Sequence, residues 1–341
     1  SLSVELFHYH DVWNADYSGN CELWQHLWKG ESLAFFSYNF QASRRLSLKT
    51  RIGLDWLQYH LHGDNSFSQL SPRINTNVQY QLNKGMLLWS FNFVNSNHGM
   101  DVINRAMIQV NSHMMEKGMP ELKKSHDINT YLYYMGRFNR LSVSAIGQFR
   151  YNPVTDDYYL DEENGKIVKT YSNGGNAQYY SAILALQYKL CKFANLSGDI
   201  RYNHAEVKTT WSKHNNNLTG NLGLNMFMGD FALKPYLHFG KKSLDEAALV
   251  ISKTPIDYGM SCSYSRGNLY VELQAVSPFK KQEKRYWLDL PIYSYSKSIK
   301  DQTASQYASI KVAYSFDFGR KTQKVKKDVN KNINSSLLRV E

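Results

Sequence analysis

Apolar and polar residues alternate along most of this chain. The final segment shows the pattern most clearly, because every second residue is apolar: Ile310, Val312, Tyr314, Phe316 and Phe318. The residues between them are small or polar: Lys311, Ala313, Ser315 and Asp317. A period of two places the two sets on opposite faces of an extended strand. Because the pattern recurs about a dozen times, it predicts a sheet with one apolar and one polar face, which is typical of a β-barrel in a membrane.

The alternating segments predict fourteen strands, so the expected fold is all-β: an antiparallel transmembrane outer-membrane β-barrel. Most segments span roughly 9 to 13 residues, which is enough to cross a bilayer when the strand is tilted. The expected strands cover residues 1–10, 34–40, 46–56, 74–82, 87–93, 128–134, 141–151, 180–189, 196–202, 218–228, 231–239, 256–264, 269–275 and 310–318. Pro235 lies inside one of them, where a bulge or a sheet edge would tolerate it.

The connections between these strands alternate between short and long. Short turns are expected near residues 44–45, 83–85, 229–230 and 266–268, and long loops at residues 11–30, 96–125, 152–176, 204–216 and 277–302. Outer-membrane barrels have short periplasmic turns at one end and longer external loops at the other. Aromatic residues gather near the strand ends, as interfacial girdles do. We therefore expect residues 1–319 to form the barrel and residues 320–341 to form a basic periplasmic tail.

Composition narrows the class of protein further. Aromatic residues make up 14% of the 341 residues, yet the mean hydropathy is −0.51. No uncharged apolar run approaches the roughly 20 residues that a membrane helix needs, so a helical membrane protein is excluded. The three cysteines have no metal or redox spacing. Much of the net charge of +11 falls in the terminal tail, which argues against a nucleic-acid partner.

The sequence shows no constellation that points to catalysis. Nucleophile and phosphate-loop motifs are absent, so we expect no enzyme and no cofactor. The acidic cluster at residues 156–163 lacks the spacing of a calcium loop, and His60 and His62 have no third metal ligand nearby in the sequence. Four aromatic residues on expected external loops are the candidate ligand contacts: Tyr158, Tyr159, Tyr286 and Trp287. Their rings can stack on a sugar or another planar ligand, or they can pack the loops.

Several short motifs, taken in order, resemble a known family. They are Leu70-Ser71-Pro72-Arg73, Gly118-Met119-Pro120-Glu121-Leu122-Lys123, Thr170-Tyr171-Ser172-Asn173-Gly174-Gly175 and the terminal Tyr314 to Lys321. From about residue 70 onward the chain resembles the C-terminal barrel of Bacteroidetes outer-membrane proteins of the TonB-dependent receptor-like family. It departs from the family pattern at Met119, where Asn is usual, and at Lys124, where the second Pro would stand. The arginine usual after the fifth strand is also missing.

The resemblance implies a 22-stranded barrel of which this chain supplies the C-terminal portion, with a plug domain, a TonB box and a regulatory domain in the missing N-terminal part. It implies an outer-membrane receptor that takes up a nutrient such as a glycan, a peptide or a metal chelate. The implied partners are outer-membrane lipid, the plug, the TonB energy-coupling protein and a surface lipoprotein. Basic residues on the polar face would pair with plug acids or attract anionic solutes: Lys49, Arg51, Lys189, Arg201 and Lys311.

Two other interpretations remain open. One is a passive channel, or a structural or adhesive outer-membrane barrel, that has no plug. The other is a soluble carbohydrate-active β-protein, whose apolar rows would face a second sheet or a packed interior instead of lipid. Three apolar side chains discriminate between a membrane sheet and a soluble β-protein: Leu184, Leu224 and Val312. If the sheet lies in a membrane, none of them can point into a dry protein core.

Overall fold

The protein consists of β-strands and their connections. The computed structural model describes residues 1–18, 22–63, 66–99, 102–154, 157–163, 165–245, 249–279, 282–291, 293–300 and 306–316. Twenty-two strands and no helix occur in these residues. Accordingly, they include no helix long and apolar enough to cross a membrane. The predicted basic tail at residues 320–341 lies outside the described residues.

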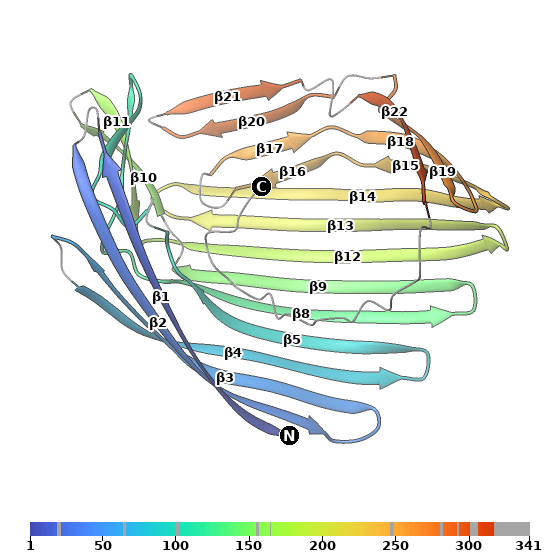
Figure 1. The fold of residues 1–341 in the computed structure, drawn as a ribbon, viewed down its shortest axis with the longest axis horizontal. Coiled ribbons are helices and arrows are strands. Elements are labelled where there is room, and N and C mark those ends of the chain that lie inside the picture. The colour runs from blue at the N-terminus through green and yellow to red at the C-terminus, as the bar shows by residue number, and fades with distance from the viewer. Residues whose placement is uncertain are drawn as a thin grey trace.

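Fourteen strands form one large antiparallel sheet, in which each strand pairs with the next one in the list (Figure 1). They are β1 (Leu2–Tyr17), β2 (Leu23–Gln41), β3 (Leu46–Leu61), β4 (Ser66–Leu82), β5 (Gly85–Ser96), β8 (Ser125–Phe138), β9 (Leu141–Val154), β12 (Asn176–Cys191), β13 (Ala194–Lys208), β14 (Ser212–Met228), β15 (Phe231–His238), β18 (Asp257–Arg266), β19 (Leu269–Val276) and β22 (Tyr307–Tyr314). The predicted number of strands in this sheet is confirmed.

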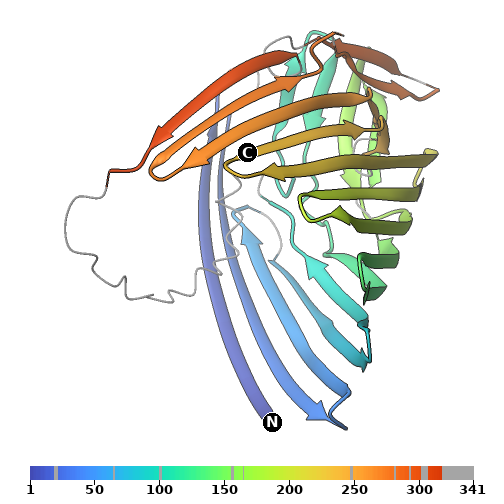
Figure 2. The same ribbon diagram turned by 90° about the vertical axis from the view of Figure 1, so that its right-hand side faces the viewer.

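Residues with the same character lie in rows across the sheet. Val4, Phe36, Ile52, Ile74 and Phe93 are successive partners on β1 to β5 and define the outer face. One residue away, a polar row on the inner face runs across β3, β4, β5, β8 and β9: Arg51, Asn75, Asn92, Asn129 and Arg150. The sheet curves into an arc (Figure 2). The alternation in the sequence therefore sorts side chains onto two faces, as expected for a pleated strand.

None of the residues that the structure describes covers the outer face. Large apolar side chains stand exposed along it, including Leu184 with 46% and Val312 with 63% of their surface accessible, and Leu224 is half-buried. None of these three side chains lies in a dry core, so the interpretation that required one is wrong for these residues. Monomeric soluble proteins rarely expose so many large apolar residues on one face. The exposed rows fit a sheet that contacts lipid.

Two predicted loops are strands. Residues 11–30 belong mostly to β1 and β2, and residues 204–216 belong mostly to β13 and β14. The paired strands extend as a ribbon beyond the segment that shows clean alternation, and there the two faces no longer differ in polarity. The expected bulge or sheet edge at Pro235 is not found: β15 lies between β14 and β18, and its register with both is unbroken. The β14–β15 ladder only omits the pairs between Gly223–Tyr236 and Met226–Leu233, because proline has no N–H for the ladder.

The long connections at one end of the sheet form two small sheets of their own. The first contains β6 (Met107–Asn111), β7 (Met114–Lys117), β10 (Asp157–Glu163) and β11 (Lys166–Ser172), in the order β10-β11-β7-β6. The second contains β16 (Lys241–Leu244), β17 (Ile251–Thr254), β20 (Lys284–Asp289) and β21 (Ser294–Ile299) in chain order. Figure 1 shows them at the end opposite the tight turns. The loops predicted at residues 96–125, 152–176 and 277–302 therefore contain hairpins.

Two apolar clusters bury the places where these connections meet the large sheet. Leu27, Leu57, Tyr59 and Leu61 pack with Ile103, which belongs to the β5–β6 connection. The second cluster brings the second small sheet against β12 and β13: Ala177, Val207, Leu249, Leu288 and Leu290. The connections are thus packed onto the inner face at one end of the sheet, where they shape the cavities described next.

Candidate functional site

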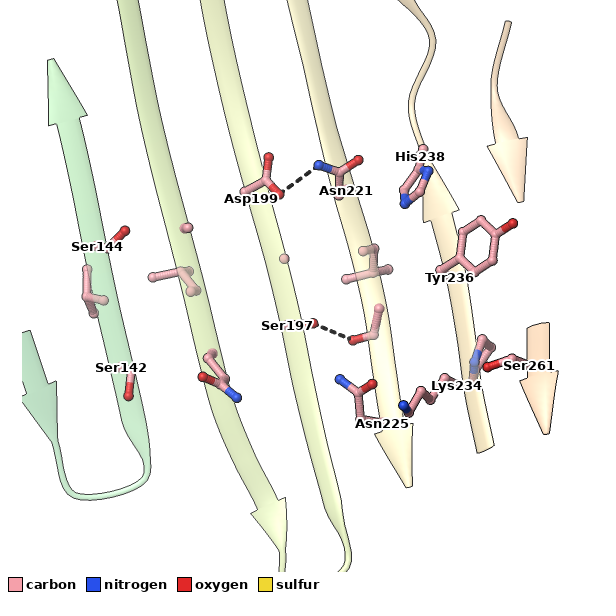
Figure 3. Close-up of a pocket in the computed structure, with 18 of the residues that line it drawn as sticks. Ser142, Ser144, Ser197, Asp199, Asn221, Asn225, Lys234, Tyr236, His238 and Ser261 are labelled. Carbon is pink, nitrogen blue, oxygen red and sulfur yellow. Dashed lines mark hydrogen bonds between the residues drawn. The ribbon is translucent and has the colours of Figure 1, made fainter. Parts of the chain in front are cut away.

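A large polar cavity occupies the inner face of the sheet. Its volume is about 780 Å³, and strands from β8 to β19 contribute its lining. Figure 3 shows hydroxyl, amide and charged side chains that the strands present to it: Ser142, Ser144, Ser197, Asp199, Asn221, Asn225, Lys234, Tyr236, His238 and Ser261. Asn221 Nδ2 donates a hydrogen bond to Asp199 Oδ1 at 2.8 Å, and Ser197 Oγ donates to the Gly223 carbonyl at 3.2 Å. Most of these groups remain available to a solute.

A second cavity, which we call the upper cavity, lies at the end of the sheet that carries the long connections. Its volume is about 510 Å³. Asp199, Asn221 and His238 line both cavities, so the two adjoin. The remaining polar lining comes from the strands and from the second small sheet, and includes Arg201, Lys241, Asp257, Gln282, Lys284 and Tyr286. The inner face therefore offers two successive polar compartments along the direction of the strands.

The structure separates the four candidate aromatic residues. Tyr286 lines the upper cavity. Trp287 follows it on β20 and so points to the other face, where Lys242 Nζ lies 5.8 Å from the centre of its ring. Tyr158 and Tyr159 are on β10, where their backbones pair with Tyr171 and Thr170; their side chains are outside the described residues. Ligand contact by these aromatic residues stays a prediction. Tyr286 is the one whose side chain is shown to line a cavity.

A buried cluster of four charged residues is the feature that the sequence did not reveal. Asp55 on β3 is fully buried and accepts two contacts from Arg73, at 2.8 Å from Nε and 2.6 Å from Nη2. Lys124 Nζ lies 2.5 Å from the other oxygen of Asp55 and 3.6 Å from Glu31 Oε1. Lys124 is also fully buried, and burial lowers the pKa of its ammonium group while Asp55 and Glu31 oppose that shift. Neighbouring carboxylates are what allow charged residues to be buried there.

Lys124 of this cluster and several hydrogen bonds nearby fix the connection at residues 97–124 to the inner face. Tyr59 Oη donates hydrogen bonds to the carbonyls of Pro120 at 2.5 Å and Leu122 at 3.2 Å. Asn173, from another connection, accepts from the Lys123 amide at 2.8 Å and donates to the Glu121 carbonyl at 3.1 Å. Three of the sequence motifs therefore lie next to one another in the structure. They are the motif that ends at Arg73, the motif at residues 118–123 and the motif that contains Asn173. Asp55 looked like an ordinary polar position of a strand, Glu31 lay outside the expected strands, and no local signal set either residue apart.

Removing the Tyr59 hydroxyl is expected to loosen this connection. Tyr59→Phe leaves the Pro120 and Leu122 carbonyls without their donor, which should destabilise the fold by about 1–2 kcal/mol. The measurable result is faster proteolysis within residues 97–124 and an earlier unfolding transition. Tyr80→Phe is the matched control, because the Tyr80 ring is exposed on the outer face. Equal cleavage rates in the two variants would contradict the proposed anchoring.

Other candidate residues have local partners. His60 Nδ1 contacts Ser66 Oγ at 3.0 Å, and the His62 ring lies 5.2 Å from that of Trp24. Groups of three or more His, Cys, Asp or Glu side chains suited to a metal do not occur in the part of the chain that the structure describes.

Among the basic residues of the polar face, Arg51 forms a 2.5 Å ion pair with Glu5, and Lys311 Nζ lies 6.0 Å from the centre of the Tyr270 ring.

Comparison with solved structures identifies the fold. The copper transporter OprC superposes with a TM-score of 0.65 at 12% identity, over 92% of this chain and 54% of OprC. The FrpB iron transporter from Neisseria meningitidis (F3-3 variant) gives 0.58 at 9% identity, over 84% of this chain and 45% of FrpB. BauA, the ferric preacinetobactin receptor from Acinetobacter baumannii, gives 0.50 at 10%, over 86% and 44%. This chain thus spans about half the length of each of these three proteins.

The fold therefore belongs to the class of outer-membrane β-barrel proteins. The matched structures are transporters and receptors by name, and their low identity to this chain makes the likeness one of fold. Comparisons with protein-family profiles and with curated protein sequences give no match.

Proposed function

We propose that this chain is part of the barrel of a TonB-dependent receptor in the outer membrane, where it takes up a nutrient. The observation that carries the proposal is the pairing of an exposed apolar outer face with adjoining polar cavities on the inner face. Such a wall separates lipid from an aqueous lumen. Long connections packed over one end of the lumen are suited to selecting a solute, and the fold is shared with transporters and receptors.

The two edges of the sheet support a larger barrel. Among the described residues, β1 pairs only with β2 and β22 pairs only with β19. In lipid, an unpaired backbone N–H or C=O costs several kcal/mol, so open sheet edges do not occur there. We propose that further strands pair with both edges and complete a barrel of 22 strands. The matched structures are about twice as long as this chain, which leaves room for those strands and for a plug.

The finer parts of the proposal rest on the resemblance in sequence. The chain would be the C-terminal barrel portion of a Bacteroidetes protein, with residues 1–319 in the barrel and residues 320–341 as a periplasmic tail. A plug domain, the TonB energy-coupling protein and a surface lipoprotein would be its partners. The nutrient would be a glycan, a peptide or a metal chelate.

Liposome swelling separates this function from a passive channel. The full-length protein is inserted into liposomes, which are then placed in an isosmotic arabinose solution. A plugged receptor should give no swelling above that of empty liposomes, and it should bind the periplasmic domain of TonB in a pull-down. Rapid swelling without TonB binding would instead show a passive pore. Recovery of the protein in the soluble fraction, without detergent, would overturn the membrane location.

A further inference from the structure

Positively charged side chains outnumber carboxylates in the lining of the upper cavity. Three cations line it: Arg201, Lys241 and Lys284. In the described part of the chain, no carboxylate lies within ion-pair distance of any of them. The two acids of the lining already have partners. Asp199 accepts from Asn221, while Asp257 accepts from Ser277 Oγ at 2.9 Å and lies 3.6 Å from His238 Nδ1. The cavity therefore has positive charge available for an anion.

Two buried polar atoms of the lining also have no partner within the described part of the chain. Gln282 is 7% exposed, and its amide nitrogen donates to the Ile256 carbonyl and to Ser277 Oγ, both at 2.7 Å. These bonds fix the amide, and its Oε1 then has no donor among the described residues. Arg201 Nε is likewise buried without an acceptor there. Solvent does not reach either atom in this conformation. Because buried polar atoms are rarely left unsatisfied, a small shift of the lining around a ligand would let the ligand's acceptor and hydroxyl donor complement them.

An aromatic ring and the position of the cavity restrict the ligand further. Tyr286 is half-buried in the lining, where its ring can lie against the C–H face of a sugar or a planar group. The cavity is on the inner face, since Asp199 and Arg201 alternate with Ile200, which is 61% exposed on the outer face. Membrane lipid contacts the outer face only. The anionic headgroups of the membrane are therefore not the ligand of this cavity.

We propose that the upper cavity binds an acidic sugar, that is, a short saccharide that carries carboxylate groups. Arg201, Lys241 and Lys284 would contact the carboxylates, Gln282 Oε1 would accept from a ring hydroxyl, and Tyr286 would stack on the sugar ring. The volume of about 510 Å³ suits a ligand of a few hundred Å³, and pockets for small molecules commonly have this size. This inference rests on the proposed uptake function and adds to it the chemical class of the nutrient.

Binding of digalacturonate and of its neutral counterpart galactobiose tests the inference. Isothermal titration of the full-length protein in detergent should show saturable binding of digalacturonate and at least roughly tenfold weaker binding of galactobiose. Citrate, an anion without a sugar ring, should also bind at least roughly tenfold more weakly than digalacturonate. Equal affinity for the charged and neutral disaccharides, or no saturable binding of digalacturonate, would overturn the proposal. Tighter binding of citrate would overturn the sugar component.

Variants locate the site. Arg201→Gln should weaken digalacturonate binding by at least roughly tenfold. Tyr286→Phe should retain binding, whereas Tyr286→Ala should lose most of it. Lys253→Gln is the matched control, because Lys253 is exposed on the second small sheet outside the cavity, and it should bind like the unmodified protein. Unchanged affinity in Arg201→Gln would contradict the assignment. Swelling and TonB binding do not depend on the ligand, so failure here remains distinguishable from failure of the proposed function.

Discussion

Asp55→Asn is expected to destabilise the protein by about 3–5 kcal/mol, since it leaves two cations, one of them fully buried, with Glu31 as their one remaining carboxylate among the described residues. Asp55 contacts both Arg73 and Lys124, and Lys124 has no access to water. The substitution keeps the shape of the side chain and removes only its charge. Lys124 must then move toward solvent, which would lift the connection at residues 97–124 from the inner face. Denaturant unfolding in detergent and protease mapping of that connection would measure both effects.

Glu5→Gln is the matched control for this prediction. Glu5 also forms an ion pair, with Arg51 at 2.5 Å, but both side chains are about two-fifths exposed. Exposed ion pairs contribute at most about 1 kcal/mol, so this variant should unfold almost like the unmodified protein. The double variant Asp55→Asn/Lys124→Met should recover part of the loss, because it removes the stranded charge as well. Similar stabilities of Asp55→Asn and Glu5→Gln would refute the structural role assigned to the buried cluster.

Leu184→Arg is expected to impair insertion into a bilayer by roughly 2–4 kcal/mol, the cost of a charge on the lipid face near the middle of the membrane. Leu184 lies halfway along β12, and its side chain is exposed on the outer face. Unfolding from lipid vesicles, followed by tryptophan fluorescence, would measure this free energy. The yield of inserted protein should fall in the same experiment.

Gln187→Arg provides the comparison on the same strand. Gln187 pairs with Ser142 and Ser197 and lines the large inner cavity, where an arginine remains in water. Its unfolding free energy should stay within about 1 kcal/mol of the unmodified value. If both arginines were tolerated equally in vesicles, the outer face would not be in lipid, and the membrane assignment would fail.

The alternation of apolar and polar residues predicted the large sheet well, because lipid and water impose opposite demands on adjacent positions. Strand β22 is an example, with Ile310 and Val312 exposed on the outer face. The same rule failed where the strands extend past the bilayer. Trp13 and Trp28 lie in regular β1 and β2 pairs, but apolar residues occupy both faces there: Trp13 packs against the inner-face cluster around Leu27, while Val12, the partner of Trp28, is exposed on the other face. Outside the bilayer neither face of a strand contacts lipid, so apolar and polar residues need not alternate, and the sequence does not show which residues face outward.

The candidate site was harder to predict, because it depends on contacts between distant segments. Arg201 was expected to be one of several basic residues on the polar face, and only the fold brings it together with Gln282 and Tyr286. Asp55 and Lys124 are 69 residues apart in the chain (124 minus 55) and become neighbours when a connection folds back onto the sheet. Strand periodicity specifies which face a residue occupies, but it gives no information on which connection covers that face.

The parallel pairing of β11 with β7 joins two connections that leave the large sheet between different pairs of strands. Met114, Met115 and Glu116 of one connection align with Ile167, Val168 and Lys169 of the other. An antibody or phage that recognises this surface would meet a composite epitope assembled from both segments. A synthetic peptide copied from either connection alone would lack half of the epitope and should raise sera that fail to bind the folded protein.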